Sequence, residues 1–235
     1  MSVRLEAISF DAGDPAALAA FWSELLGREV TSDARGLLLA GNGTQLGLRF
    51  VDETTERSKR NRLHVHVTTS SLDDERRIVA AALVLGGRSQ GSGHPPIGRD
   101  VYLIDPDGNE FCVIEPANQY LAGTGLLGEV TCNGTRAASW FWRQALDWVT
   151  VWDEGDQLAI QSPEGGTKIG WDVWPDTKGP GWNRQRFDLV ADDVEAAVAR
   201  LLALGATRID DAAGAVRMLD PDGSEFSVRA GVVAG

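Results

Sequence analysis

The stretch Leu103-Ile-Asp-Pro-Asp-Gly-Asn-Glu-Phe111 returns later in the chain, almost unchanged, as Met218-Leu-Asp-Pro-Asp-Gly-Ser-Glu-Phe226. In each copy, an Asp-Pro-Asp-Gly segment separates two short apolar runs. Proline presets φ and glycine accepts φ > 0, so each copy predicts a β-hairpin turn. Two hairpins this similar in one chain indicate an internal repeat.

Two further matches occur in the same order in both copies. Ala20-Phe-Trp-Ser-Glu-Leu-Leu-Gly27 corresponds to Trp140-Phe-Trp-Arg-Gln-Ala-Leu-Asp147, and both place apolar residues at helical spacing. Arg62-Leu-His-Val-His-Val67 corresponds to Arg184-Gln-Arg-Phe-Asp-Leu189, and each of these segments predicts a strand. Asp14, followed by a proline, is a typical N-cap for the first helix.

The three matches divide the chain into two copies of one domain. We predict a first domain at residues 1–118, a linker at 119–125 and a second domain at 126–235. Within each domain, a strand, a helix and a few short strands occur twice in succession. These predicted units lie at residues 3–51 and 62–116 in the first domain, and at 126–174 and 184–230 in the second.

Composition narrows the classes of partner and compartment. Lys and Arg number 22 against 34 Asp and Glu, which gives a net charge of −12 and disfavours binding to phosphate backbones. No apolar run approaches the roughly 18–20 residues that a membrane span needs, and the N-terminus lacks signal-peptide features. Cys112 and Cys132 have neither metal-site nor disulfide-framework spacing. We expect a cytoplasmic protein that binds neither nucleic acid nor membrane.

Three segments carry a resemblance to a known family. They are Asp14-Pro-Ala-Ala-Leu-Ala-Ala-Phe-Trp-Ser-Glu-Leu-Leu-Gly27, Asn61-Arg-Leu-His64 and Asp105-Pro-Asp-Gly-Asn-Glu-Phe-Cys-Val113. With them the chain resembles the vicinal oxygen chelate superfamily, and more narrowly the glyoxalase-like domain proteins common in actinobacteria. The resemblance implies an α+β fold of two tandem domains. In each, two βαβββ units form a curved mixed sheet around a cavity, with the helices outside.

The superfamily includes glyoxalases, extradiol dioxygenases and metal-free drug-binding proteins, so the fold alone does not choose a function. In its metal enzymes, His, Gln or Glu ligands come from the first strand of each unit and from the last strand. Alternate residues of a strand face opposite sides, so strand parity tests whether this chain carries such ligands.

The first strand offers no obvious metal ligand. Ile8 and Phe10 are expected to face the helix, which leaves Ala7 and Ser9 facing inward. The usual ligand position falls on Ala7, which cannot bind a metal. Glu6 would serve only if the register were shifted by one residue.

The second unit of the first domain is richer. His64 and His66 are expected to face inward, and His64 falls on a family ligand position. Cys112 occupies the position where metal enzymes carry Glu, and Glu110 faces inward near the hairpin. If a metal is bound, His64 and Glu110 are its expected ligands. The alternative interpretation is that the two histidines only line a polar cavity.

The second domain is poorer in ligands. It carries Arg186, Asp188 and Ser227 where the first domain has its two histidines and Cys112. An arginine repels a divalent cation, and no triad of two histidines and a carboxylate is evident in either domain. We therefore expect no cofactor, with a divalent metal as the alternative.

Our leading hypothesis is a protein that binds a small aromatic or amphipathic molecule in the cavity of one or both domains. Arg186 would suit an anionic group of the ligand, with Asp188 as its nearest inward partner, and Trp171 would stack on it. The predicted ligand-binding residues are His64, His66, Cys112, Arg186, Asp188 and Trp171.

Two other functions stay open at this stage. One is a metal-dependent lyase, isomerase or dioxygenase centred on His64, which requires Glu6, His66 or Glu110 to converge on it. The other is a protein-interaction module whose two cavities are filled by side chains. We expect either a monomer with pseudo-dimeric halves or a homodimer.

Several residues that resemble functional groups have a simpler structural interpretation. Asp105 and Asp220 are expected to be hairpin-turn residues rather than catalytic carboxylates. Trp22 and Trp142, at helical spacing, are expected in the core. His94 lies in a predicted Gly/Pro-rich loop.

Overall fold

The computed structural model describes residues 3–53, 61–90, 99–172 and 182–231. His94 and Trp174 lie outside the described residues. Over these ranges the chain forms four helices: α1 (Pro15–Leu26), α2 (Leu72–Val84), α3 (Arg136–Leu146) and α4 (Val194–Ala203). None of these helices has the length and apolar character needed to cross a membrane.

The first helix begins where the sequence predicts. The Asp14 side chain accepts a hydrogen bond from the Ala17 backbone N–H, and a proline follows at the first position of α1. Gly27 ends α1 in the left-handed region at φ 63°, and Asp147 ends α3 in the same region at φ 56°. The two repeats therefore end their first helices with the same backbone geometry, and only the first uses glycine to do so.

Sixteen strands in the described residues form two eight-stranded sheets. Sheet A has the order β14-β15-β16-β13-β1-β4-β3-β2, and sheet B has the order β10-β11-β12-β9-β5-β8-β7-β6. The strands of sheet A are β1 (Arg4–Ala12), β2 (Val30–Asp33), β3 (Gly36–Leu39), β4 (Gly47–Asp52), β13 (Gln185–Ala191), β14 (Thr207–Ala212), β15 (Ala215–Leu219) and β16 (Glu225–Ala230). The strands of sheet B are β5 (Leu63–Val67), β6 (Arg88–Ser89), β7 (Val101–Ile104), β8 (Glu110–Val113), β9 (Leu127–Asn133), β10 (Val149–Glu154), β11 (Gln157–Gln161) and β12 (Lys168–Asp172).

The predicted fold class is confirmed: the chain is α+β, with two curved mixed sheets built from four βαβββ units. The pairing of the units differs from the expectation that the two units of each domain form one sheet. Sheet A joins the first unit to the fourth through the antiparallel pair β1–β13, and sheet B joins the second to the third through β5–β9. Each sheet is therefore shared by both repeats, instead of belonging to one of them.

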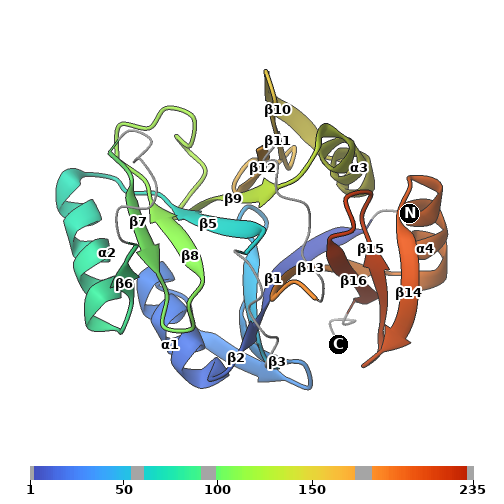
Figure 1. The fold of residues 1–235 in the computed structure, drawn as a ribbon, viewed down its shortest axis with the longest axis horizontal. Coiled ribbons are helices and arrows are strands. Elements are labelled where there is room, and N and C mark those ends of the chain that lie inside the picture. Colours follow the sequence, from blue (N-terminus) through green and yellow to red (C-terminus); the bar gives the residue numbers. More distant parts are fainter. Residues whose placement is uncertain (1–2, 54–60, 91–98, 173–181, 232–235) are drawn as a thin grey trace.

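The aromatic contacts of the helices, by contrast, stay within each repeat. Trp22 of α1 packs edge-on against Phe111 of β8, with ring centroids 5.1 Å apart, so α1 reaches from its own sheet to the other. Trp142 of α3 packs in the same way against Phe226 of β16 at 5.0 Å. Figure 1 shows the consequence: α1 and α2 lie at one end of the molecule, and α3 and α4 at the opposite end.

Besides turning the chain, each repeated hairpin accepts a hydrogen bond from a tryptophan of a helix. Asp105 accepts backbone hydrogen bonds from Asn109 at 2.8 Å within its turn, which confirms the predicted turn role. It also accepts the indole N–H of Trp22 at 3.2 Å, and Asp220 accepts that of Trp142 at 3.1 Å. In both repeats, the turn carboxylate thus anchors the aromatic residue of the preceding helix.

Candidate functional site

A cavity of about 450 Å³ lies on the concave face of sheet B. Both repeats contribute to it, because β5, β7 and β8 come from the first and β9 to β12 from the second. Its wall combines aromatic rings with carboxyl groups and the two predicted histidines. Among the lining side chains are His64, His66, Tyr102, Glu110, Cys112 and Trp152.

Strand parity placed the inward side chains of the first repeat correctly. His66 pairs with Cys112 across β5 and β8, and both line the cavity together with His64 and Glu110. The intervening Val65 is 1 % exposed and packs into the core on the opposite face. Alternation along the strand therefore separates a polar cavity wall from an apolar helix-facing core.

The second repeat supplies a carboxylate that faces His66. Glu129 on β9 lies 3.1 Å from the His66 ring, measured from Oε2 to Nδ1. Its other oxygen accepts a hydrogen bond from the Tyr120 hydroxyl at 2.6 Å, and Thr131 donates to Oε2 at 3.3 Å. These contacts give the carboxylate three polar partners inside the protein.

The two groups favour each other's charged forms. Burial disfavours the imidazolium of His66, but hydrogen bonds to Cys112 and Glu129 outweigh it and hold the pKa of His66 well above its usual value. Burial likewise disfavours the Glu129 carboxylate, and contacts with His66, Tyr120 and Thr131 outweigh it, so the pKa of Glu129 is lowered. A buried ion pair results.

The sequence analysis missed Glu129 and Tyr120. Glu129 has the same register position in sheet B that Ala7 has in sheet A, because Ala7 pairs with Asp188 and Glu129 pairs with His66. The parity rule applied to the first strand of the second repeat would have found this carboxylate. Tyr120 belongs to the predicted linker, which forms part of the cavity wall.

The remaining wall comes from β10, β11 and β12. Trp152 packs edge-on against Tyr120 with ring centroids 5.6 Å apart. Asp172 accepts a hydrogen bond from the Gln157 side chain at 2.9 Å, while burial raises the pKa of its carboxyl group. Trp171 borders the cavity but is only 3 % exposed, because it packs into the helix-facing core.

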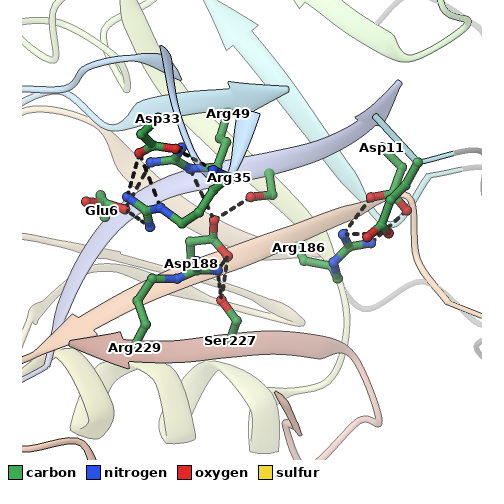
Figure 2. A network of polar contacts seen from close by, with 11 residues as sticks. Glu6, Asp11, Asp33, Arg35, Arg49, Arg186, Asp188, Ser227 and Arg229 are labelled. Carbon is green, nitrogen blue, oxygen red and sulfur yellow. Dashed lines mark hydrogen bonds and ion pairs between the residues drawn. The ribbon is translucent and has the colours of Figure 1, made fainter. Parts of the chain in front are cut away.

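The concave face of sheet A is built very differently, as Figure 2 shows. Arg49 extends across it with its side chain 1 % exposed. Its guanidinium lies 2.8 Å from Asp33, 3.4 Å from Glu6 and 3.7 Å from Asp188. Side chains of the protein itself thus occupy the space that corresponds to the cavity of sheet B.

Arg186 and Asp188 lie in this network, and the expected pairing between them was wrong. Arg186 forms a two-pronged ion pair with Asp11, at 2.8 Å and 2.5 Å. Asp188 instead accepts hydrogen bonds from Ser9 and Ser227. Both residues were predicted from parity to face inward, which they do, but they lie in sheet A, whereas the histidines lie in sheet B.

Glu6 also belongs to sheet A. The pairing of β1 with β13 shifts between Leu5 and Ala7, and this irregularity accompanies an ion pair between Glu6 and Arg35 at 2.8 Å. Glu6 therefore cannot converge with His64, as the metal-enzyme hypothesis allowed.

The donor set of the cavity does not fit a catalytic metal. Across the described ranges, no group of three or more His, Cys, Asp or Glu residues is arranged to hold a metal ion. One ring nitrogen of His66 faces Glu129 at 3.1 Å, and the other lies 3.4 Å from the Thr131 hydroxyl. A metal at this position would have to break the ion pair.

The fold has well-matched relatives among solved structures. Glyoxalase I from Zea mays shares 15 % identity, with a TM-score of 0.68 over 97 % of this chain and 92 % of that one. A putative dioxygenase from Bacillus subtilis subsp. subtilis str. 168 shares 16 % identity, with a TM-score of 0.61 over 97 % and 85 %. At these identities the likeness shows the fold alone. No curated protein matches the chain in sequence.

The family itself is set by the sequence of both repeats. Residues 7–114 and 129–229 each match the model of the glyoxalase-like domain. These two segments cover most of the chain and leave out the connection that contributes Tyr120 to the cavity. The chain therefore belongs to the glyoxalase-like domain family, with two copies of the domain in one polypeptide.

Proposed function

We propose that this protein binds a small aromatic or amphipathic molecule in the cavity of sheet B. The observation that carries the proposal is the cavity itself, whose volume of about 450 Å³ lies in the range typical of small-molecule sites. Its wall offers the combination that such sites use, namely aromatic surface with a few fixed polar groups.

The polar groups are held in place before any ligand arrives. Glu129 is fixed by His66, Tyr120 and Thr131, so its carboxylate need not reorganise on binding. Pre-organised groups of this kind reduce the entropic cost of binding. The proposed site is composite, because His66 belongs to the first repeat and Glu129 to the second.

The alternatives from the sequence are less well supported. The metal-dependent enzyme lacks a converging donor set in the described residues. The interaction module with two filled cavities fits sheet A, where Arg49 occupies the concave face, but not sheet B. A protein that binds its ligand in the cavity of sheet B, and whose own side chains cover the concave face of sheet A, fits both observations.

Tryptophan fluorescence tests the proposal directly. Trp152 lines the cavity and is 40 % exposed, whereas Trp140 on α3 is 42 % exposed and does not line it. Titration with a panel of neutral and charged aromatic compounds is expected to change the emission of the protein saturably. The Trp152→Phe variant should lose most of that response, and the matched Trp140→Phe variant should keep it.

A response that Trp152→Phe keeps in full would place the binding elsewhere. The absence of saturable binding by any compound of the panel, checked by equilibrium dialysis, would refute the proposed function.

A further inference from the structure

The two sheets can be compared position by position, because their strands pair in the same register. Ser9 of β1 pairs with Arg49 of β4, and Thr131 of β9 pairs with Gly170 of β12. Ser9 also pairs with Arg186, and Thr131 with His64. Gly170 is therefore the counterpart of Arg49.

In sheet A this position supplies a cation to three carboxylates. The Arg49 guanidinium contacts Asp33, Glu6 and Asp188 and is almost completely shielded from solvent. Asp188, the buried carboxylate of the three, thus receives a guanidinium from within the chain, which compensates for its removal from water.

In sheet B the same position carries no side chain. A Cβ atom on Gly170 would lie 2.4 Å from Glu129 Oε1 and 3.7 Å from the Tyr120 hydroxyl, so the carboxylate of Glu129 lies directly over the glycine. Asp172 follows two residues along β12, on the same face of the strand.

Acidic groups outnumber basic groups in this cavity wall. The imidazolium of His66 pairs with Glu129, whereas Asp100, Glu110 and Asp172 also line the wall and no lysine or arginine of the described ranges does. Lys168 lies close by, but its ammonium group bonds to the Tyr120 carbonyl and lies 4.0 Å from the centre of the Tyr120 ring.

We infer that the ligand of sheet B is an organic cation, a guanidinium, amidinium or amine on an aromatic body, whose charged group lies against the carboxylates of Glu129 and Asp172, next to Gly170. The ligand would supply from outside the charge that Arg49 supplies in sheet A. This inference rests on the proposed function and names the ligand class for the same cavity.

The aromatic wall suits the same class of molecule. Trp152 and Tyr120 form an edge-to-face pair in the wall, and Tyr102 lies on β7 in the same cavity. Aromatic faces attract organic cations and also stack on an aromatic body. Charge and shape therefore favour the same ligand chemistry.

Three probes of nearly equal shape separate charge from shape. Isothermal titration calorimetry with benzamidine, benzamide and benzoate compares a cation, a neutral isostere and an anion. Benzamidine is expected to bind about tenfold more tightly than benzamide, since hydrogen bonds to charged groups contribute that much, and benzoate should bind least. The preference should shrink as salt is added.

Two variants test the assigned position. Asp172→Asn should lower the preference for benzamidine over benzamide, whereas Asp210→Asn, which removes the same charge from β14 of sheet A, should leave it unchanged. Gly170→Arg should abolish benzamidine binding, because the new guanidinium occupies the place of the ligand as Arg49 does in sheet A. Circular dichroism establishes that each variant is folded.

The outcomes are distinguishable. Equal binding of benzamidine and benzamide, or an unchanged preference in folded Asp172→Asn, would overturn the inference and leave the proposed cavity function standing. No binding by these probes or by any compound of the fluorescence panel would overturn both.

Discussion

Sheets A and B are built from equivalent units, yet one concave face is filled and the other is open. In sheet A, Arg49 crosses the face and joins carboxylates that approach it from β1, β2 and β13. In sheet B, the equivalent Gly170 leaves room, and a cavity of about 450 Å³ remains. The comparison teaches that duplication preserved the frame while the inward positions diverged.

Under the proposed function, the divergence separates a structural role of sheet A from a binding role of sheet B. Sheet A pairs its buried charges internally, and these ion pairs link the first and fourth units. Sheet B keeps one internal ion pair, between His66 and Glu129, and directs further carboxylates at the cavity.

The largest expected effect comes from breaking the network of sheet A. Arg49→Met keeps much of the side-chain volume but leaves Asp33, Glu6 and Asp188 without their shared cation. Removing one partner of a buried ion pair costs about 3–5 kcal/mol. Because Arg35 still pairs with Asp33 and Glu6, and Arg229 lies 3.6 Å from Asp188, we expect a loss of free energy of unfolding towards the lower end of that range. Urea denaturation measures it.

The control for this variant lies in the same sheet. Arg208 pairs with Asp211 at the surface, where ion pairs contribute little, so Arg208→Met should cost far less stability than Arg49→Met. Equal losses in the two variants would show that the filled face of sheet A has no special structural role.

A loss of stability of intermediate size is expected from a contact that both repeats share, the hydrogen bond from a helix tryptophan to a turn carboxylate. Trp22→Phe and Trp142→Phe each remove an indole donor from a buried carboxylate, at Asp105 and Asp220 respectively. Losing a hydrogen bond to a charged group costs about 1.5–3 kcal/mol, and the two losses of stability should be similar. Trp140→Phe, on the exposed side of α3, is the control and should have little effect.

In the wild-type protein, the Asp105 carboxyl group that accepts the Trp22 indole N–H also predicts how the free energy of unfolding changes with pH. Burial raises the pKa of Asp105 to about 6. A carboxyl group whose pKa is higher in the folded state favours folding when protonated, so this contribution is lost as pH rises towards and through that value.

A stability loss confined to one of the two tryptophan variants would contradict the equivalence of the repeats.

The smallest expected effect is a change of stability with pH that His66 causes in sheet B and that sheet A lacks. The pKa of His66 is raised in the folded state, so its contribution to stability is present in full below about 6.5 and is lost as pH rises through the folded value. The free energy of unfolding of wild type minus that of His66→Gln should therefore decline above neutral pH.

The same ion pair sets the opposite trend in acid. Because the pKa of Glu129 is lowered, its contribution is lost as pH falls through the folded value. Asp188 takes the place of His66 in sheet A, so Asp188→Asn should show no decline above neutral pH. A flat difference for His66→Gln would contradict a charged pair in sheet B.

Much of this architecture was predictable, because its determinants are local. Turn residues such as Asp105 and the cap at Asp14 act over a few positions, and strand alternation assigned Ser9, His66 and Cys112 to the inward side. These features need no knowledge of the neighbouring strand.

The partners of the inward residues were not predictable in the same way. All four units share one pattern, so parity does not say which unit pairs with which. Arg186 therefore meets Asp11 instead of Asp188, and His66 meets Glu129 from the other repeat. The local irregularity at Glu6 likewise depends on the pairing of β1 with β13.

The crossed pairing also governs how the molecule should come apart. We expect that neither repeat unfolds alone. Each repeat supplies one strand of the central pair in both sheets, so its unfolding would expose the partner strand in each sheet and would separate His66 from Glu129. Despite its two domains, the chain should melt in a single cooperative transition, with calorimetric and van't Hoff enthalpies that agree.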